Sequence, residues 1–216
     1  MPRVGLTPAL IAAEAAALSD ERGFDELSLA AVAKRFGVAP PSLYKHVDGL
    51  AGLRREVSLL TVTELGDRLQ GAAVGLAGPE AVRALFTAYR NYAHEHPGGY
   101  TATQRAPDPS DTEASNIYAR PVQVIAAVLR GFDIPEDQMV HTVRALRSAV
   151  HGFIDLEAQG GFRMPENIDE SYDVLVEGFI RALERWPAST TGRGTGHNTR
   201  HGTGRAADHT THEGEN

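Results

Sequence analysis

The stretch SLAAVAKRFGVAPPSLYKHV, residues 28 to 47, has the pattern of two short helices joined by a tight turn. Ser28 is placed to cap the first helix, because its side-chain oxygen can accept a hydrogen bond from a free backbone N–H of the first turn. Gly37 is placed to end that helix, because glycine adopts the left-handed conformation that a side chain opposes. Either Pro40 or Pro41 suits the first turn of the second helix, where no N–H is needed. The stretch therefore predicts a helix-turn-helix.

The two predicted helices have distinct apolar and polar faces. The first carries one apolar stripe at helical spacing, formed by Leu29, Val32, Ala33 and Phe36. On the second, Leu43 and Val47 are four residues apart and are expected to face that stripe. The outward side chains are then Ser42, Tyr44, Lys45 and His46. A helix in a DNA major groove uses such groups to reach phosphates and base edges, although any solvated helical hairpin also has a polar outer face.

The distribution of charge favours the DNA interpretation of this stretch. Residues 28 to 55 hold five Lys or Arg against one Asp, or 5 − 1 = +4, in a chain whose net charge is −7. Residues 61 to 186 hold 11 Lys or Arg against 18 Asp or Glu, or 11 − 18 = −7. An acidic body repels a polyanion, so contact with nucleic acid must be confined to the N-terminal unit.

The composition excludes several classes of protein. The chain of 216 residues has no cysteine, which rules out disulfides, thiol catalysis, cysteine zinc sites and iron–sulfur clusters. It shows neither a run of about 18 apolar residues nor a secretion signal, so we expect a cytoplasmic protein that does not contact a membrane. No glycine-rich phosphate loop follows a strand and no serine elbow is present. We therefore expect neither an enzyme nor a cofactor.

The rest of the chain also has helical periodicity, which predicts an all-α fold. Thr7 and Pro8 mark the start of a first helix, and Asp48 is placed to cap a helix that runs to Leu69. Two offset apolar stripes on that helix, before and after residue 61, indicate that its two halves pack against different structures. Pro121 either kinks a later helix or marks its late start. The expected later helices are Pro79 to Glu95, Glu113 to Arg130, Pro135 to Gln159 and Asp169 to Trp186.

These patterns divide the chain into four parts. Residues 1 to 47 form the helix-turn-helix domain, residues 48 to 70 a connecting helix, and residues 79 to 186 a larger helical bundle. HPGGY, residues 96 to 100, is expected to end a helix, and residues 101 to 112 to form a loop around at most a short helical turn. Residues 187 to 216 contain no Leu, Ile, Val, Met or aromatic residue, so we expect a disordered tail.

Three segments resemble the TetR family of transcriptional regulators. GFDELSLAAVAKRFGVAPPSLYKHV, residues 23 to 47, is similar to the DNA-binding domain of that family. HPGGY and LRSAVHGFIDLEAQGGF, residues 146 to 162, resemble the ligand-binding domain of its WHG subgroup. The resemblance implies a homodimer that binds a palindromic double-stranded DNA operator, acts as a repressor and is released by a small-molecule effector.

The resemblance also assigns candidate residues. Many TetR members have a lysine where this chain has Leu50, so Arg54 or Arg55 would supply that phosphate contact. The implied DNA contacts are Ser28, Ser42, Tyr44, Lys45, His46 and Arg54. Polar or amphipathic side chains on the apolar helices are candidate effector ligands: Tyr89, Tyr92, Tyr100, Tyr118, His141, Arg144 and His151.

The protein must act as a dimer, because one short recognition helix cannot specify a long DNA site. Two recognition helices on a two-fold axis reach successive major grooves about 34 Å apart. The last two helices carry apolar stripes that predict either a dimer interface or the core of each monomer. These stripes consist of Leu146, Val150, Phe153, Ile154, Leu175, Phe179 and Leu183. The helix from Asp48 to Leu69 is expected to transmit an effector signal to the DNA-binding domain.

A metal-binding helical bundle is the alternative interpretation. His94, Glu95 and His96 could chelate a metal ion, as could His141 with a later carboxylate. The chain lacks the paired Glu and Glu-x-x-His set of a di-iron bundle, and histidines that end a helix more often interact with its dipole. We therefore predict no metal site.

Overall fold

The computed structural model describes residues 5–186 and is helical throughout that part, without strands. Its elements are α1 Pro8–Arg22, the 3-10 helix η1 Phe24–Glu26, α2 Leu29–Phe36, the 3-10 helix η2 Pro40–Lys45, α3 Gly49–Ala73, α4 Gly78–Glu95, α5 Pro97–Thr103, α6 Thr112–Leu129, α7 Glu136–Ala158 and α8 Ile168–Glu184. The all-α prediction is confirmed. The predicted disordered tail lies outside the described residues. No helix between residues 5 and 186 is long and apolar enough to cross a bilayer.

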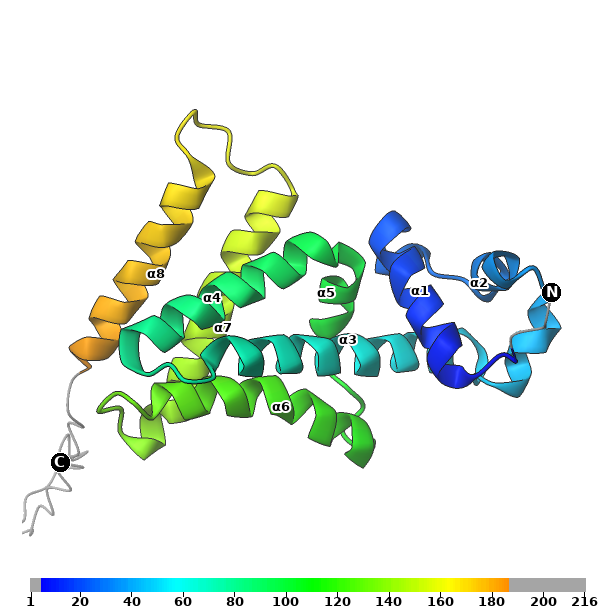
Figure 1. Cartoon of the computed structure of the whole chain (residues 1–216), viewed down its shortest axis with the longest axis horizontal. Helices are drawn as coiled ribbons and strands as arrows, with labels where there is room; N and C mark the ends of the chain where they lie inside the picture. Colours follow the sequence, from blue (N-terminus) through cyan, green and yellow to red (C-terminus); the bar gives the residue numbers. More distant parts are fainter. Residues whose placement is uncertain (1–4, 187–216) are drawn as a thin grey trace, which may run out of the picture.

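The chain builds two hydrophobic cores that share helix α3. Leu53 and Val57 of α3 pack into a small core with residues of α1, η1, α2 and η2. Leu65 and Leu69, in the second half of α3, pack into the larger core of α4, α6, α7 and α8. Figure 1 shows α3 running from beneath α1 into the bundle. The prediction that the two halves of this helix contact different structures is therefore confirmed.

Helix caps explain where the first helices begin. The Thr7 hydroxyl accepts the N–H of Leu10 at 3.2 Å, and the Ser28 hydroxyl accepts the N–H of Ala31 at 3.2 Å. Asp48 occupies the N-cap position of α3, but its side chain makes no capping hydrogen bond. The sequence prediction for Asp48 was therefore wrong about the bond, although it placed the start of the helix correctly.

The segment after α4 differs from the prediction. HPGGY ends α4 and also begins α5, with Pro97 at the first helical position. The loop that follows covers only the residues between Thr103 and Thr112. Helix α6 continues through Pro121, whose ring lies 3.6 Å from the position that a Cβ on Gly66 of α3 would occupy. The small residue therefore allows α3 and α6 to pack closely around the proline.

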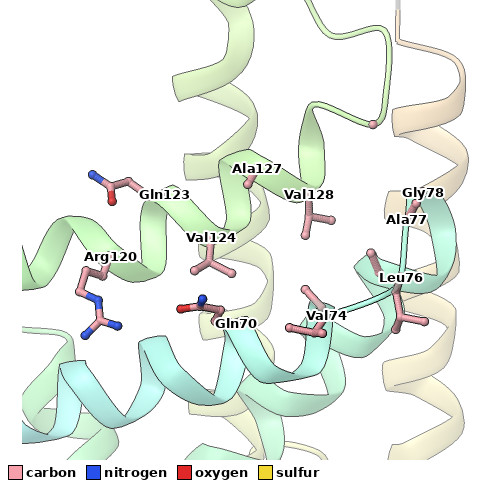
Figure 2. A pocket seen from close by; sticks show the side chains of 13 residues that line it. Gln70, Val74, Leu76, Ala77, Gly78, Arg120, Gln123, Val124, Ala127 and Val128 are labelled. Carbon is pink, nitrogen blue, oxygen red and sulfur yellow. The ribbon is translucent and has the colours of Figure 1, made fainter.

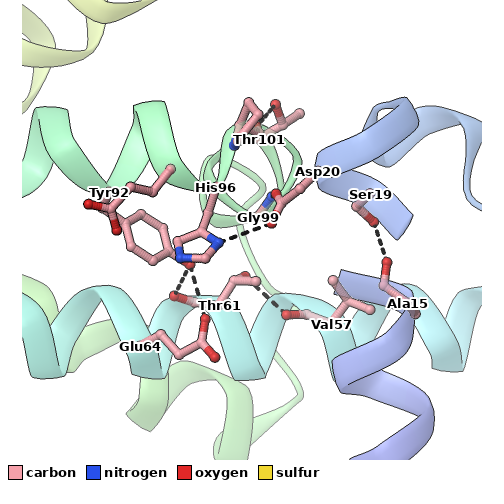
Figure 3. A network of polar contacts seen from close by, with 12 residues as sticks. Ala15, Ser19, Asp20, Val57, Thr61, Glu64, Tyr92, His96, Gly99 and Thr101 are labelled. Atoms are coloured by element: carbon pink, nitrogen blue, oxygen red, sulfur yellow. Dashed lines mark hydrogen bonds and ion pairs between the residues drawn. The ribbon is translucent and has the colours of Figure 1, made fainter. Parts of the chain in front are cut away.

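Helix α5 joins the helix-turn-helix unit to the bundle. A Cβ on Gly98 would lie 2.1 Å from the carbonyl carbon and oxygen of Ser19, so only glycine allows α1 and α5 this close. The Asp20 carboxylate accepts the N–H of Gly99 at 2.9 Å and contacts Nδ1 of His96 at 3.0 Å. Figure 3 shows this network between α1 and the start of α5.

Candidate DNA-binding surface and effector cavity

The helix-turn-helix has the predicted caps and buried face. Gly37 ends α2 in the left-handed conformation, with φ 65° and ψ 30°. Leu43 is 0% and Val47 6% exposed, so both face the small core as predicted. The second helix is a six-residue 3-10 helix instead of an α-helix. Its tighter winding eclipses side chains three residues apart, which the α-helical periodicity did not anticipate.

The predicted recognition residues lie together at the end of the molecule farthest from the bundle. Tyr44 is 61% exposed and Lys45 is exposed, whereas Ser42 and His46 are half-buried. Ser42, Lys45 and His46 line one broad surface hollow together with Arg35. The Ser28 hydroxyl is half-buried and already caps α2, so a phosphate that approached it would meet the start of that helix.

The positive charge of this region is smaller than the local count indicates. Arg35 pairs with Glu14 and Glu21 of α1, and Arg55 pairs with acidic residues at the start of α6. Lys34 and Lys45 are exposed and form no ion pair with any residue between 5 and 186. Lys45, which lines the hollow, is therefore an unpaired cation of the described residues that can reach a phosphate there.

Arg54 lies away from the hollow that Lys45 lines, and its contact with DNA remains a prediction. Its Nη2 donates to the carbonyl oxygen of Asp25 at 2.8 Å, and its guanidinium carbon lies 5.9 Å from the centroid of the Phe24 ring. The side chain lines a cavity between the two units together with residues of the α5–α6 connection. Arg54 therefore faces the bundle and not the recognition residues, and Arg55 is occupied by Asp111 and Glu113.

A small cavity of about 40 Å³ lies inside the bundle. Tyr89 and Tyr118 line it, as two of the seven predicted effector ligands. Tyr89 is 5% exposed, and its hydroxyl makes no hydrogen bond to the residues that the structure describes. The other lining residues come from α3, α5, α6 and α7: Val62, Leu65, Thr103, Pro121, Val122, Ile125, Val143 and Arg147.

The other predicted effector ligands have different environments. Tyr92 is fully buried and donates to the carbonyl oxygen of Thr61 at 3.1 Å, and burial raises the pKa of its phenol. The hydroxyl of Tyr100 is 2.7 Å from Nδ1 of His151, so these two side chains satisfy one another. His141 and Arg144 are exposed on α7 and line none of the cavities described here. The sequence missed Arg147, because an exposed arginine on α7 carries no pattern that separates it from Arg144.

A wider groove of about 500 Å³ lies at the C-terminal end of α3. Figure 2 shows Gln70 of α3 and Val74 of the turn after it facing Gln123 and Val124 of α6 across the groove. Its one charged lining residue is Arg120, which pairs with Asp67 at 2.8 Å. None of the predicted effector ligands lines this groove.

Comparisons with known proteins match both halves of the chain. Residues 11–57 match the model of bacterial regulatory proteins of the tetR family, and residues 82–179 match the tetracyclin repressor-like C-terminal domain. The uncharacterized HTH-type transcriptional regulator YobS of Bacillus subtilis is 34% identical over 182 residues, which are 84% of this chain and 95% of that protein. The chain belongs to the TetR family.

A second relative supports this assignment, and a solved structure shares the fold. The uncharacterized HTH-type transcriptional regulator Rv0681 of Mycobacterium tuberculosis is 38% identical over 180 residues, which are 82% of this TetR-family chain and 79% of that protein. A crystal structure of a TetR variant from Acinetobacter baumannii AYE in complex with minocycline shares the fold, with a TM-score of 0.64 at 18% identity. The alignment covers 86% of this chain and 100% of that one. TetR-family proteins are transcriptional regulators and not enzymes.

The predicted dimer residues of this TetR-family chain fall into two groups. Leu146, Val150, Ile154 and Leu183 are buried in the core of a single chain, with at most 3% of each side chain exposed. Phe153, Leu175 and Phe179 are only partly buried and pack against that core from its edge. The first four therefore serve the monomer, which was the alternative that the stripes left open. A dimer interface would instead use the outer faces of α7 and α8.

The histidines of the metal-binding alternative have other partners in this TetR-family chain. His94 contacts Glu157 at 3.0 Å and His96 contacts Asp20 at 3.0 Å. Between residues 5 and 186 no three His, Cys, Asp or Glu side chains are grouped as metal ligands. Together with the family, these contacts do not favour the metal-binding interpretation.

Proposed function

We propose that this TetR-family chain is a ligand-responsive repressor that binds a palindromic operator as a homodimer and is released by a small molecule. One observation carries the proposal: α3 contributes to both the core beneath the recognition residues and the wall of the inner cavity. Leu53 and Val57 hold the first half, and Val62 and Leu65 line the cavity with the second half. A ligand that displaces the second half therefore acts on a helix that positions the recognition unit.

The inner cavity supports an effector of mainly apolar character with at least one hydrogen-bonding group. Most of its lining is aliphatic or aromatic, and the free hydroxyl of Tyr89 provides a donor. Its volume of about 40 Å³ accommodates about one water molecule, so a ligand must enlarge it. The ligand would therefore bind more tightly to a conformation in which the helices have moved apart. A switch requires such a difference in ligand affinity between two conformations.

On the DNA side, the proposal assigns the sequence-independent contacts to exposed groups of the recognition unit. Lys45 is exposed and unpaired within the described residues, and Tyr44 projects beside it. Ser42 and His46 line the same hollow as Lys45. Two such units on one dimer would read two half-sites in successive major grooves.

The experiment is to select bound sequences from random duplex DNA and to measure affinity for the selected operator over a range of salt concentrations. We expect Lys45→Ala to weaken binding and to reduce the salt slope by about 1 per protomer, because one phosphate contact and its released counterion are lost. Arg83→Ala is the matched control, because Arg83 is an exposed cation paired with Glu177 on the bundle. Selection that returns no palindrome would contradict the dimeric operator, and an unchanged slope would remove Lys45 from the phosphate contacts.

A further inference from the structure

A second cavity, of about 310 Å³, lies between the DNA-binding unit and the bundle. We call it the junction cavity; it is lined by Phe24, Ala51, Arg54, Arg55, Ser58, Leu59, Arg105, Ala106, Pro107, Asp108, Asp111, Ala114 and Tyr118. One wall therefore comes from η1 and the first half of α3, and the other from the α5–α6 connection and the start of α6. Tyr118 also lines the inner cavity, so the two cavities share this aromatic side chain.

Arg54 brings an unbalanced positive charge to this cavity. Within residues 5–186 no carboxylate lies within ion-pair distance of its guanidinium, and Nη2 donates only to the Asp25 carbonyl oxygen. Its Nε is buried and has no hydrogen-bond partner. A half-buried cation without a counter-charge is unfavourable, because it has lost part of its hydration without replacement. An anion in the cavity would supply the missing charge.

Arg105 brings a second cation to the same aromatic ring. Its guanidinium carbon lies 5.3 Å from the centroid of Phe24, opposite the α3 wall that carries Arg54. Its ion-pair partner Asp25 is 68% exposed, and an exposed pair of this kind contributes little because water screens it. An incoming acid group can therefore compete for Arg105.

The remaining charges restrict where an acid group can lie. Arg55 already donates to the carboxylates of Asp111, Glu113 and Glu56, so its positive charge is balanced within the protein. The Asp108 carboxylate accepts the N–H and the hydroxyl of Ser110 and faces the cavity as a negative charge. Asp108 and Asp111 repel an anion from their side, whereas Arg54 and Arg105 attract it to the side of Phe24.

We propose that the junction cavity binds a small organic anion, an apolar or aromatic molecule that bears one carboxylate or sulfonate. The acid group lies near Arg54 and Arg105, and the apolar part contacts Leu59, Ala114 and Tyr118. Since the two walls belong to different units, the affinity for the anion changes when the units move relative to each other. An effect on operator binding rests on the proposed function, and by linkage the operator and the anion then change one another's affinity equally.

The test uses two fluorescent probes that share a ring system and differ in charge: anilinonaphthalene sulfonate and neutral N-phenylnaphthylamine. Each is titrated into the full-length chain without DNA. We expect Arg54→Gln and Arg105→Gln each to weaken binding of the sulfonate about five- to tenfold, since each removes a charge-assisted hydrogen bond. Affinity for the neutral probe should change less than about twofold, because its binding does not depend on these charges.

Two further variants locate the site. Ala106→Trp places a large side chain at an exposed lining position and should weaken both probes, whereas Arg83→Gln, far from the cavity, should affect neither. Arg105 is 51% exposed, so Arg105→Gln keeps the test available if Arg54→Gln impairs folding. Unchanged sulfonate affinity in both arginine variants, or equal losses for both probes, would overturn the proposal. No DNA is present, so failure here leaves the operator proposal standing.

Discussion

Arg90 is a largely enclosed cation whose charge is balanced by carboxylates from two other helices. Its side chain is 12% exposed and pairs with Glu157 of α7 and Asp169 of α8. Its guanidinium carbon also lies 4.8 Å from the centroid of the Tyr172 ring. The hydrogen bonds from Arg90 hold the pKa of Glu157 below its usual value, and His94 adds to this effect. This residue cluster therefore ties α4 to α7 and α8 through charge as well as apolar packing.

The lowered pKa of Glu157 gives a pH-dependent contribution to stability. A carboxyl whose pKa is lower in the folded state stabilises the fold above its unfolded value, near 4.5, and this contribution is lost as the pH falls through the folded value. We expect Glu157→Gln to lower the free energy of unfolding at pH 7 by about 1.5–3 kcal/mol. Below about pH 4 the difference in free energy of unfolding between the parent chain and the variant should become smaller. Urea unfolding of both chains at several pH values measures this difference.

Glu166→Gln is the control for this prediction. Glu166 is exposed in the α7–α8 connection and forms no ion pair with the described part of the chain. Its substitution should change the free energy of unfolding by less than about 0.5 kcal/mol at every pH. If Glu157→Gln lowered the free energy of unfolding by the same amount at pH 7 and at pH 3, the proposed ionic contribution would be contradicted.

At the residue scale, local sequence predicts caps and buried positions but not distant partners. Ser28, Gly37 and Leu43 could be assigned because their roles depend on neighbours within a few positions. The ion pair that neutralises Arg55 could not be predicted, since its partner Asp111 lies 56 residues further along the chain. The count of +4 for residues 28 to 55 was correct, but acidic residues from α1 and α6 neutralise part of it. Only the packing of the units reveals that Arg54 faces a cavity.

At the element scale, helix α5 contacts both units along its short length. His96 contacts Asp20 through Nδ1 and Arg68 through Nε2, at 3.0 and 3.2 Å. Arg68 can only donate, so Nε2 must accept and the proton lies on Nδ1. At the other end of α5, Thr103 lines the inner cavity. The route of an effector signal remains a prediction, and we expect α5 to provide a second path from that cavity to α1 beside the path through α3.

Gly98→Ala tests the contact between α1 and α5. The added methyl would lie 2.1 Å from backbone atoms of Ser19, which no side-chain rotation can relieve, so the two helices must separate. We expect a loss of about 1–3 kcal/mol in the free energy of unfolding, as for an overpacked core. Urea denaturation of the purified chain measures the change.

Gly71→Ala provides the comparison within another helix. Gly71 lies in α3, is exposed, and a Cβ there would have no atom within 4 Å. Alanine at this position should stabilise the chain by about 0.5–1 kcal/mol through helix propensity. If both variants proved equally stable, the close α1–α5 contact would not exist in solution.

The two elements that the sequence described least well are η2 and α5. Pro40 and Pro41 fit the start of an α-helix or of a 3-10 helix, so the sequence could not distinguish these windings. In HPGGY, proline and two glycines are typical of the end of a helix, which is why a further helix was not expected there. Here Pro97 occupies the first position of α5, and Gly98 is required by a contact with α1 that local sequence cannot reveal.

At the scale of the whole molecule, the outer faces of α7 and α8 carry apolar residues that the monomer does not use. Leu156 on α7 is 50% exposed, and Val174 on α8 is 68% exposed. Gly152 and Gly178 lie on the same two helices, and a Cβ on either would have open space around it. Exposed apolar side chains beside small residues suit close helix packing against a second copy. The dimer interface remains a prediction, with these residues in place of the buried ones.

Val174→Asp tests this surface. A carboxylate there would be desolvated by a facing helix, so we expect a monomer in light scattering at concentrations where the parent chain is a dimer. Folding of the monomer should be retained, since the side chain is already 68% exposed. Val74→Asp is the matched control, because Val74 is 72% exposed in the turn after α3 and should leave the dimer intact. A dimeric Val174→Asp variant would move the interface away from α8.

Helix α3 has a consequence for how the molecule comes apart. The first half of this 25-residue helix contributes to one core and the second half to the other, so loss of either core releases half of a helix on which the other core depends. Helix formation is cooperative, and a frayed half weakens the half that remains. We therefore expect the two units to unfold together. The boundary predicted at residue 48 would then not separate two parts of the chain that unfold independently.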